Sequence, residues 1–270
     1  MSIVLPMKSC FSITLLFGLS IALWCISYPL SAWSALFLIP MLLFVLLGTF
    51  RNALDRRRSL ILSTVCTDSS LLGLLTGNLI PALAAIIIST LSLSTIAVHT
   101  IFATPIQIAA LLAIVAASTL AYSSLVRICE PHIRPLALSW FSAATAVFLV
   151  STLFVVPYAF FEWSVVERPG FIRLGFDEAM SEAIGQLPRR DDILNRAVSV
   201  FHVVDSTMLW LASQPHFNGT MAPGALYAAH SALICIVVST SSVGTASFYR
   251  HYIETRVWRQ PDSAEGTKND

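Results

Sequence analysis

Long runs of apolar residues, separated by short polar segments, are the main pattern along this chain. A helix needs about 20 mostly apolar residues to cross the hydrocarbon core of a bilayer. Runs of this kind fall at 10–27, 32–50, within 59–100, 105–126, 136–161 and 223–248. The first two form a predicted hairpin over 10–50, followed by a basic loop at 51–58. The pattern therefore predicts an all-α fold, a polytopic transmembrane helix bundle of about six spans, five of them within 1–161.

The region 59–100 is long enough for either one span or two. Two spans would turn at 77–81, because glycine, asparagine and proline favour turns. Cytoplasmic loops carry an excess of basic residues, and six spans leave only five of the sixteen basic residues on the outer side. Seven spans would also place the arginines of the polar tail at 249–270 outside. We therefore predict six spans with both termini cytoplasmic, in a membrane that the sequence does not identify.

Residues 162–222 form a long hydrophilic segment that we predict to be an extracytoplasmic loop. Apolar side chains in its first half recur with helical spacing, at Phe176, Met180, Ala183, Ile184 and Leu187. Its second half carries a polar stripe, formed by Asp192, Asn195, Ser199, His202 and Ser206. These patterns predict two amphipathic helices that lie on the membrane surface or cap the bundle. Residues 198–212 are apolar enough that their entry into the membrane remains the alternative.

Composition excludes several classes of protein. The hydrophobic fraction is 56% and the mean hydropathy is +0.77, whereas only 11% of residues are charged. A soluble domain carries about 25% charged residues, so a water-soluble globular enzyme and a disordered regulator are both excluded. The five cysteines form no CxxC pair, and the net charge of +1 includes no basic stripe for nucleic acid. The predicted partners are therefore the lipid bilayer and other membrane proteins, or a second copy of this chain.

A few polar residues within the apolar runs are candidates for a functional site. The candidate intramembrane polar site consists of Asp68, Asn78, Gln107, His99 and His230. A carboxylate at the bilayer centre costs about 2.5–3.5 kcal/mol, so Asp68 is either a proton or cation site or the cap of a helix at the interface. The two histidines fall in the outer half of their spans, where a metal or a haem is one interpretation. No metal-binding spacing supports it, and we predict neither a cofactor nor a metal.

Motifs of known enzyme classes are absent from the chain, including the P-loop, GxSxG and HExxH. No catalytic residue is predicted, and the chain is more easily interpreted as a non-enzyme. The main hypothesis is an accessory subunit, assembly factor or scaffold that works through partners. Its candidate interaction loop contains Phe176, Met180, Ile184, His202 and Asp205. The alternatives are a small transporter or channel that uses Asp68 and its polar neighbours, and a redox subunit with histidine-bound haem or metal.

Overall fold

The computed structural model describes residues 4–64, 77–164, 174–213 and 222–254. Within these ranges every regular element is a helix, and six segments are long and apolar enough to cross a membrane. The six segments are Met7–Ser27, Ala32–Ile61, Leu79–Ile101, Pro105–Cys129, Ala137–Glu162 and Tyr227–Tyr252. The all-α fold and the predicted number of spans are therefore confirmed.

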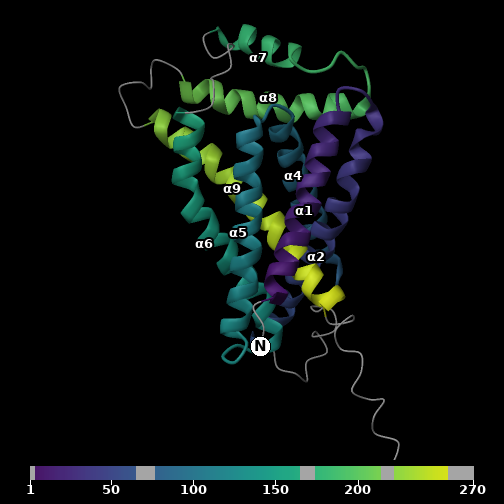
Figure 1. Cartoon of the computed structure of the whole chain (residues 1–270), viewed down its shortest axis with the longest axis vertical. Coiled ribbons are helices and arrows are strands. Elements are labelled where there is room, and N and C mark those ends of the chain that lie inside the picture. The colour runs from purple at the N-terminus through teal and green to yellow at the C-terminus, as the bar shows by residue number, and fades with distance from the viewer. Residues whose placement is uncertain (1–3, 65–76, 165–173, 214–221, 255–270) are drawn as a thin grey trace, which may run out of the picture.

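The described residues form eight α-helices and two shorter helical segments. They are α1 (Val4–Ser27), the 3₁₀ segment η1 (Ala32–Leu38), α2 (Ile39–Thr64), α4 (Leu79–Ile101), α5 (Pro105–Cys129), α6 (Pro135–Ser164), α7 (Phe176–Gly185), α8 (Ile193–Ser213), α9 (Ala222–Phe248) and the π-helical segment η4 (Tyr249–Glu254). The long helices run between the two ends of the molecule, whereas α7 and α8 lie across one end (Figure 1). The start of α1 lies at the opposite end, together with the last turns of α9 (Figure 1).

The region 59–100 contributes one complete span. It contains the end of α2, which continues to Thr64, and all but the last residue of α4, which spans Leu79–Ile101. Residues 51–58, which we expected to form a loop, are instead helical. Arg51 Nε lies 3.2 Å from Asp55 Oδ2 one turn later, an ion pair that supports helix at this spacing. An apolar run predicts the part of a helix that crosses the membrane, and the helix itself continues beyond it.

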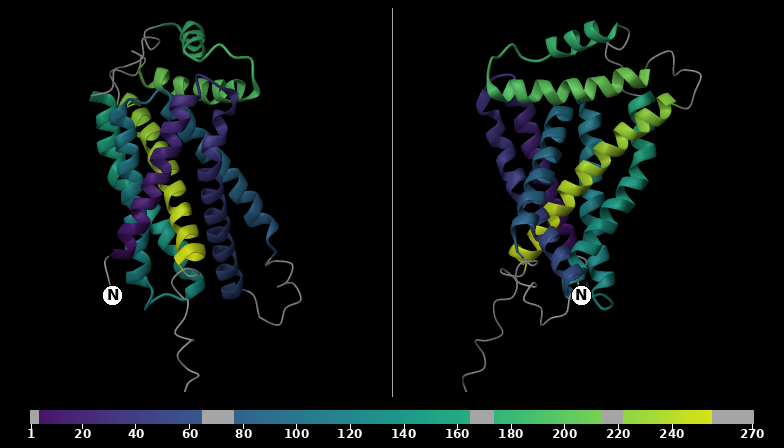
Figure 2. Two further views of the ribbon diagram at one scale, coloured as in Figure 1. Left: turned by 45° about the vertical axis from the view of Figure 1, so that its right-hand side comes forward. Right: turned by 180° about the vertical axis from the view of Figure 1, so that it is seen from behind.

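Helix α9 crosses the bundle diagonally and packs against α1, α2, α4, α5, α6 and α8 (Figure 2). Its small residues make these close approaches possible, as is usual for helices within membranes. A close approach joins α2 and α9, where a Cβ added to Gly48 would lie 1.7 Å from the carbonyl oxygen of Gly244. Ser239 on the same helix accepts a hydrogen bond from Ser118 of α5 at 3.1 Å. Close packing and hydroxyl contacts therefore hold the central helix in place.

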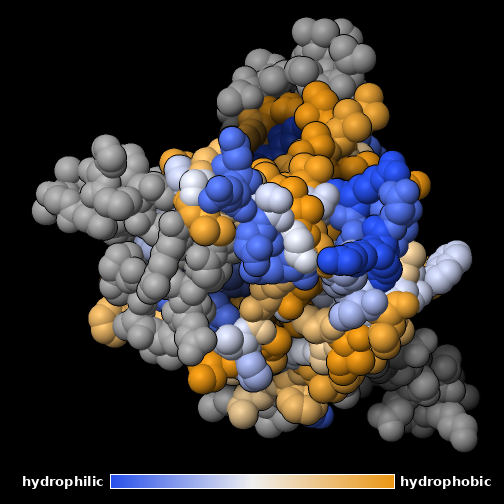
Figure 3. All heavy atoms as spheres, turned by 90° about the horizontal axis from the view of Figure 1, so that it is seen from above, coloured by the Kyte–Doolittle hydropathy of each residue, from blue (hydrophilic) through white to orange (hydrophobic). Residues whose placement is uncertain are grey.

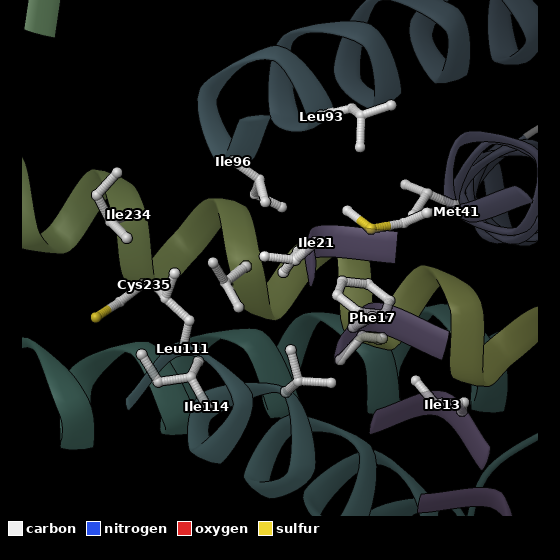
Figure 4. Packing of buried hydrophobic residues seen from close by; sticks show 14 of the residues in the cluster. Ile13, Phe17, Ile21, Met41, Leu93, Ile96, Leu111, Ile114, Ile234 and Cys235 are labelled. Carbon is white, nitrogen blue, oxygen red and sulfur yellow. The ribbon is translucent and has the colours of Figure 1, made fainter. Parts of the chain in front are cut away.

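An apolar core fills the space between the long helices. Figure 4 shows side chains from five of these helices meeting within it. The labelled residues are Ile13, Phe17, Ile21, Met41, Leu93, Ile96, Leu111, Ile114, Ile234 and Cys235. The indole of Trp24, buried at the edge of this core, donates a hydrogen bond to the Ala97 carbonyl at 2.9 Å. This bond connects α1 to α4 near the end of the bundle that α8 covers.

Hydrogen bonds attach the start of α8 to the bundle. The Asp192 carboxylate accepts a hydrogen bond from the Asn195 backbone at 2.7 Å, as residues at helix N-termini commonly do. Asn195 Oδ1 in turn accepts a hydrogen bond from the Tyr28 hydroxyl at 2.7 Å. The Arg190 guanidinium donates to the Tyr28 carbonyl and lies over the Tyr28 ring. These contacts connect α8 to the residue that follows α1.

Helix α8 buries polar side chains against the bundle and exposes apolar ones, which is unusual for a helix that packs on a protein. His202 and Ser206 from its polar stripe are buried, whereas Val200 and Val204 are exposed. The end of the molecule that carries α7 and α8 consequently shows hydrophobic and hydrophilic side chains next to one another (Figure 3). The Asn195 side chain of this stripe contacts Tyr28, and Asp205 on the same helix reaches His230 of α9.

Candidate functional site

Five polar or charged side chains from four helices meet at the end of the bundle beneath α8. His99 lies in the last turn of α4, Tyr158 and Glu162 lie in the last turns of α6, and His230 lies about two turns into α9. Asp205 reaches the same place from the middle of α8. We call His99, Tyr158, Glu162, Asp205 and His230 the histidine–carboxylate cluster.

His230 lies between the two carboxylates of the cluster. Its Nε2 donates a hydrogen bond to Asp205 Oδ1 at 2.6 Å, and its Nδ1 lies 3.4 Å from Glu162 Oε2. The same Glu162 oxygen accepts a hydrogen bond from the Ser231 hydroxyl at 3.0 Å. A histidine with a carboxylate at each ring nitrogen is well placed to carry a proton on both nitrogens or to exchange a proton for a cation.

His99 occupies the second half of the cluster. Its Nε2 lies 2.8 Å from the Tyr158 hydroxyl and 3.9 Å from Glu162 Oε1. The ring centroids of His99 and His230 are 6.0 Å apart. Glu162 therefore faces both histidines, and the contacts form one connected set from α4 through α6 and α9 to α8.

The cluster is almost fully shielded from solvent. His230 is 3% exposed and Glu162 is 6% exposed, whereas the Asp205 side chain retains 24%. A buried carboxylate is costly without partners of opposite charge or hydrogen-bond donors, and each carboxylate here contacts at least one histidine ring nitrogen. Burial raises the pKa of the Asp205 carboxyl, but the hydrogen bond with His230 and the charges of the nearby histidines outweigh burial and hold this pKa below its usual value.

His202 lies on α8, one turn before Asp205, and belongs to a different contact. Its ring stacks on the Phe102 ring at the end of α4, with 4.2 Å between the centroids. Burial lowers the pKa of His202, which favours the neutral imidazole. His202 therefore packs at the end of α4 and is not part of the cluster formed by His99, His230 and the two carboxylates.

Three residues of the cluster form a group that could hold a metal ion. One ligand atom from each of His99, Asp205 and His230 lies within 4.8 Å of the other two. A tetrahedral zinc ion with bonds of about 2.1 Å holds its ligand atoms about 3.4 Å apart, so small side-chain movements would close this site around an ion. Two imidazoles and one carboxylate form the donor set of catalytic zinc sites and of non-haem iron(II) sites. Glu162 lies behind His230, where metal sites place the carboxylate that orients a ligand histidine.

The candidate intramembrane residues do not all gather at one place. His99 and His230 come together in the cluster, whereas Asn78 directly precedes the first residue of α4, at the opposite end of that helix from His99. Asn78 is exposed and makes no side-chain hydrogen bond to cap the helix. Two of the proposed polar residues therefore share one site, and Asn78 lies away from it.

Gln107 takes part in a local capping interaction at the start of α5. Its side-chain oxygen accepts a hydrogen bond from the Thr104 backbone at 2.8 Å, and the Thr104 hydroxyl accepts one from the Gln107 backbone at 3.3 Å. This reciprocal pair is a capping box, which accounts for the buried amide without a ligand. Asp68 lies outside the described residues.

The candidate interaction loop divides between two environments. His202 and Asp205 face the bundle, whereas Phe176 and Ile184 on α7 are partly exposed, at 45% and 47%. Met180 is buried against α8, where its sulfur accepts a hydrogen bond from Thr207 at 3.3 Å. The exposed residues of this loop, Phe176 and Ile184, therefore lie on a different helix from His202 and Asp205, which contact the bundle.

Sequence reasoning missed Tyr158 and Glu162. Glu162 directly follows the apolar run 136–161 and was assigned to the adjoining loop, whereas α6 continues to Ser164. The available signal was the spacing of four residues between Tyr158 and Glu162, which places both on one face of a helix. A carboxylate at the end of a span, at the depth expected for two histidines, identifies the third helix of the site.

Comparison of the chain with models of protein families, with curated proteins and with solved structures finds no match.

Proposed function

We propose that this integral membrane protein binds a divalent transition-metal ion, such as zinc, in the histidine–carboxylate cluster. The observation that carries the proposal is the convergence of ligand atoms from His99, Asp205 and His230 within 4.8 Å of one another. These ligands come from three helices, of which α4 is more than 100 residues before Asp205 in the sequence and α8 and α9 are consecutive. An ion bound here would therefore connect α4, α8 and α9.

The environment of these ligands supports an ion of charge +2. Glu162 and Asp205 bring two carboxylates to a site beside only two imidazoles, and a bound cation balances this charge. Metal binding replaces the protons of its ligands, so an ion would displace the proton that His230 now donates to Asp205. The Nδ1 atom of His230 is buried and has no hydrogen-bond partner among the described residues, which leaves it available to a ligand or to a reoriented Glu162.

A site with three protein ligands resembles catalytic metal sites more than structural ones. Structural zinc sites are closed by four protein ligands, whereas catalytic sites keep one position for water or substrate. Water bound to zinc has a pKa near 7 and is a nucleophile at neutral pH. In such a site the Glu162 carboxylate, which lies 3.9 Å from His99 and 3.4 Å from His230, and the Tyr158 hydroxyl, 2.8 Å from His99, would be the groups available to accept or donate a proton. Metal-assisted hydrolysis at the membrane interface is thus the reaction class that this centre supports best.

The experiment is elemental analysis of the full chain purified in mild detergent. We expect about one zinc or iron ion per chain, and its loss in the variants His230→Gln and His99→Gln. His202→Gln is the matched control, because His202 lies at the same end but stacks on Phe102 instead of joining the cluster. Helix content measured by circular dichroism shows whether each variant is folded.

Two results would overturn the metal proposal. The first is a protein that stays metal-free after dialysis against zinc, with its helix content intact. The second is an equal amount of metal in the folded wild type and in both cluster variants, which would assign the ion to adventitious binding elsewhere.

A second candidate function is action through a partner protein, as an accessory subunit, assembly factor or scaffold. It is favoured by the apolar residues Ile193, Val200 and Val204, which α8 exposes at the end of the bundle. Exposed apolar residues that lie close together often mark protein contacts. Co-purification in mild detergent tests it: the variant V200S/V204S should lose a bound protein that the lipid-facing control Leu153→Ser retains. The transporter alternative has less support, because Asn78 and Gln107 lie away from the cluster.

A further inference from the structure

A large groove lies among α2, α4, α6 and α9, and no part of the histidine–carboxylate cluster lines it. Its volume is about 1240 Å³, which exceeds the range of about 300–1,000 Å³ usual for small-molecule pockets. α4 leans away from the bundle towards the end that carries the N-terminus, which separates it from α6 there (Figure 2). The groove is therefore large enough for a molecule with long chains.

The walls of the groove are mainly apolar. Ile80 and Ile88 from α4 face Val147, Phe148 and neighbouring residues from α6 across it. Phe148 is 69% exposed in the described chain, and its position in a membrane-spanning segment means that it contacts hydrocarbon. Walls of this kind suit acyl chains, and they offer too few polar groups for a water-soluble metabolite.

The other feature of the groove is a pair of arginines at the end of α2. Arg56 and Arg57 both line the groove. The Arg56 guanidinium lies over the Trp140 ring at 5.9 Å from its centroid, and Arg57 Nη1 donates to the Gly77 carbonyl at 3.2 Å. Neither guanidinium forms an ion pair with a carboxylate in the described part of the chain. The groove thus joins an apolar channel to two positive charges that have no acidic partner among the described residues.

This combination matches one class of molecule. A glycerophospholipid with an anionic headgroup carries negative charge at one end and acyl chains at the other. Basic pockets between transmembrane helices bind such headgroups, because the surrounding hydrocarbon strengthens the charge attraction. Trp140 is also suited to the headgroup level, where tryptophan is enriched in membrane proteins.

We propose that the groove between α4 and α6 binds one anionic glycerophospholipid. Its phosphate contacts Arg56 and Arg57, and its acyl chains follow the apolar walls towards Ile88 and Val155. This site is separate from the histidine–carboxylate cluster, which lies at the other end of α4. Loss of metal binding and loss of lipid binding are therefore independent outcomes.

Native mass spectrometry of the full chain tests the proposal, with phosphatidylglycerol and phosphatidylcholine as the probes. We expect one phosphatidylglycerol to stay bound and phosphatidylcholine with the same acyl chains to be lost. The double variant R56Q/R57Q should bind phosphatidylglycerol about 30-fold more weakly, which corresponds to ~1 kcal/mol per basic residue. Arg58→Gln is the matched control, because Arg58 is adjacent in sequence but does not line the groove.

A second variant tests the apolar part of the groove. Ala144 lines it and is exposed, so Ala144→Phe should fill the groove without disturbing the core and should also weaken phosphatidylglycerol binding. Ala109→Phe, at an exposed position of α5 outside the groove, should not. Equal retention of both lipids, or equal weakening by R58Q and by R56Q/R57Q, would overturn the proposal and indicate a general lipid shell.

Discussion

Removal of the Glu162 charge is the sharpest test of the electrostatics in the cluster. The variant Glu162→Gln keeps the size of the side chain but removes the charge that faces two histidines. His230 Nδ1 lies 3.4 Å from Glu162 Oε2, a distance at which two unit charges attract by about 5 kcal/mol at an effective dielectric constant of 20. Part of this attraction offsets the cost of burying the charges, and loss of one partner of a buried pair costs about 3–5 kcal/mol.

We therefore expect E162Q to lower the free energy of unfolding by about 3 kcal/mol. The assay is reversible unfolding in mixed micelles with increasing denaturing detergent, followed by circular dichroism. Glu130→Gln is the control, because Glu130 makes only an exposed ion pair with Arg250 at 3.8 Å. Exposed pairs of this kind contribute about 0–1 kcal/mol, so E130Q should change little.

A double-mutant cycle separates the pair from its surroundings. If Glu162 and His230 interact as the structure places them, E162Q and H230Q together should cost less than the sum of the two single variants, by about 1–3 kcal/mol. The reasoning is refuted if E162Q destabilises no more than E130Q, because Glu162 would then carry no charge that the bundle needs.

Two further predictions concern the packing of the bundle and the start of α5. Gly48→Ala should destabilise the protein by about 1–3 kcal/mol, because its Cβ would lie 1.7 Å from the Gly244 carbonyl oxygen and force α2 and α9 apart. Gly185→Ala is its control, since a Cβ there meets nothing within 4 Å; equal effects of the two variants in the unfolding assay would contradict the close contact. Thr104→Ala should cost about 1 kcal/mol through loss of the capping box with Gln107. An unchanged unfolding free energy for T104A would show that this cap contributes nothing to stability.

The sequence predicts the long helices well, because the requirement for about 20 apolar residues acts on each segment separately. The location of the ends of helices was less accurate. Residues 51–58 and Glu162 follow apolar runs and were assigned to loops, yet α2 and α6 continue through them. Hydrophobicity marks where a helix contacts lipid, whereas hydrogen bonding and tertiary packing decide where the helix ends.

The candidate site was also predicted only in part from the sequence. The sequence identified His99 and His230 as candidate functional residues because each is an ionisable residue within an apolar run. It grouped them with Asn78 and Gln107, which the fold places in unrelated local environments. Asp205 was assigned to the candidate interaction loop, whereas its carboxylate contacts His230 at 2.6 Å.

Composition and periodicity alone therefore determined that this chain is an all-helical membrane bundle of six spans. Whether a segment forms a membrane-spanning helix depends on the residues within that segment and on the surrounding lipid. The tertiary structure decided that four helices bring two histidines and two carboxylates together, and that α8 contributes Asp205 to them. The physical reason is that a buried charge must find its partner in space. Residues 99, 162, 205 and 230 are far apart in the sequence, and only the way in which α4, α6, α8 and α9 pack makes them neighbours.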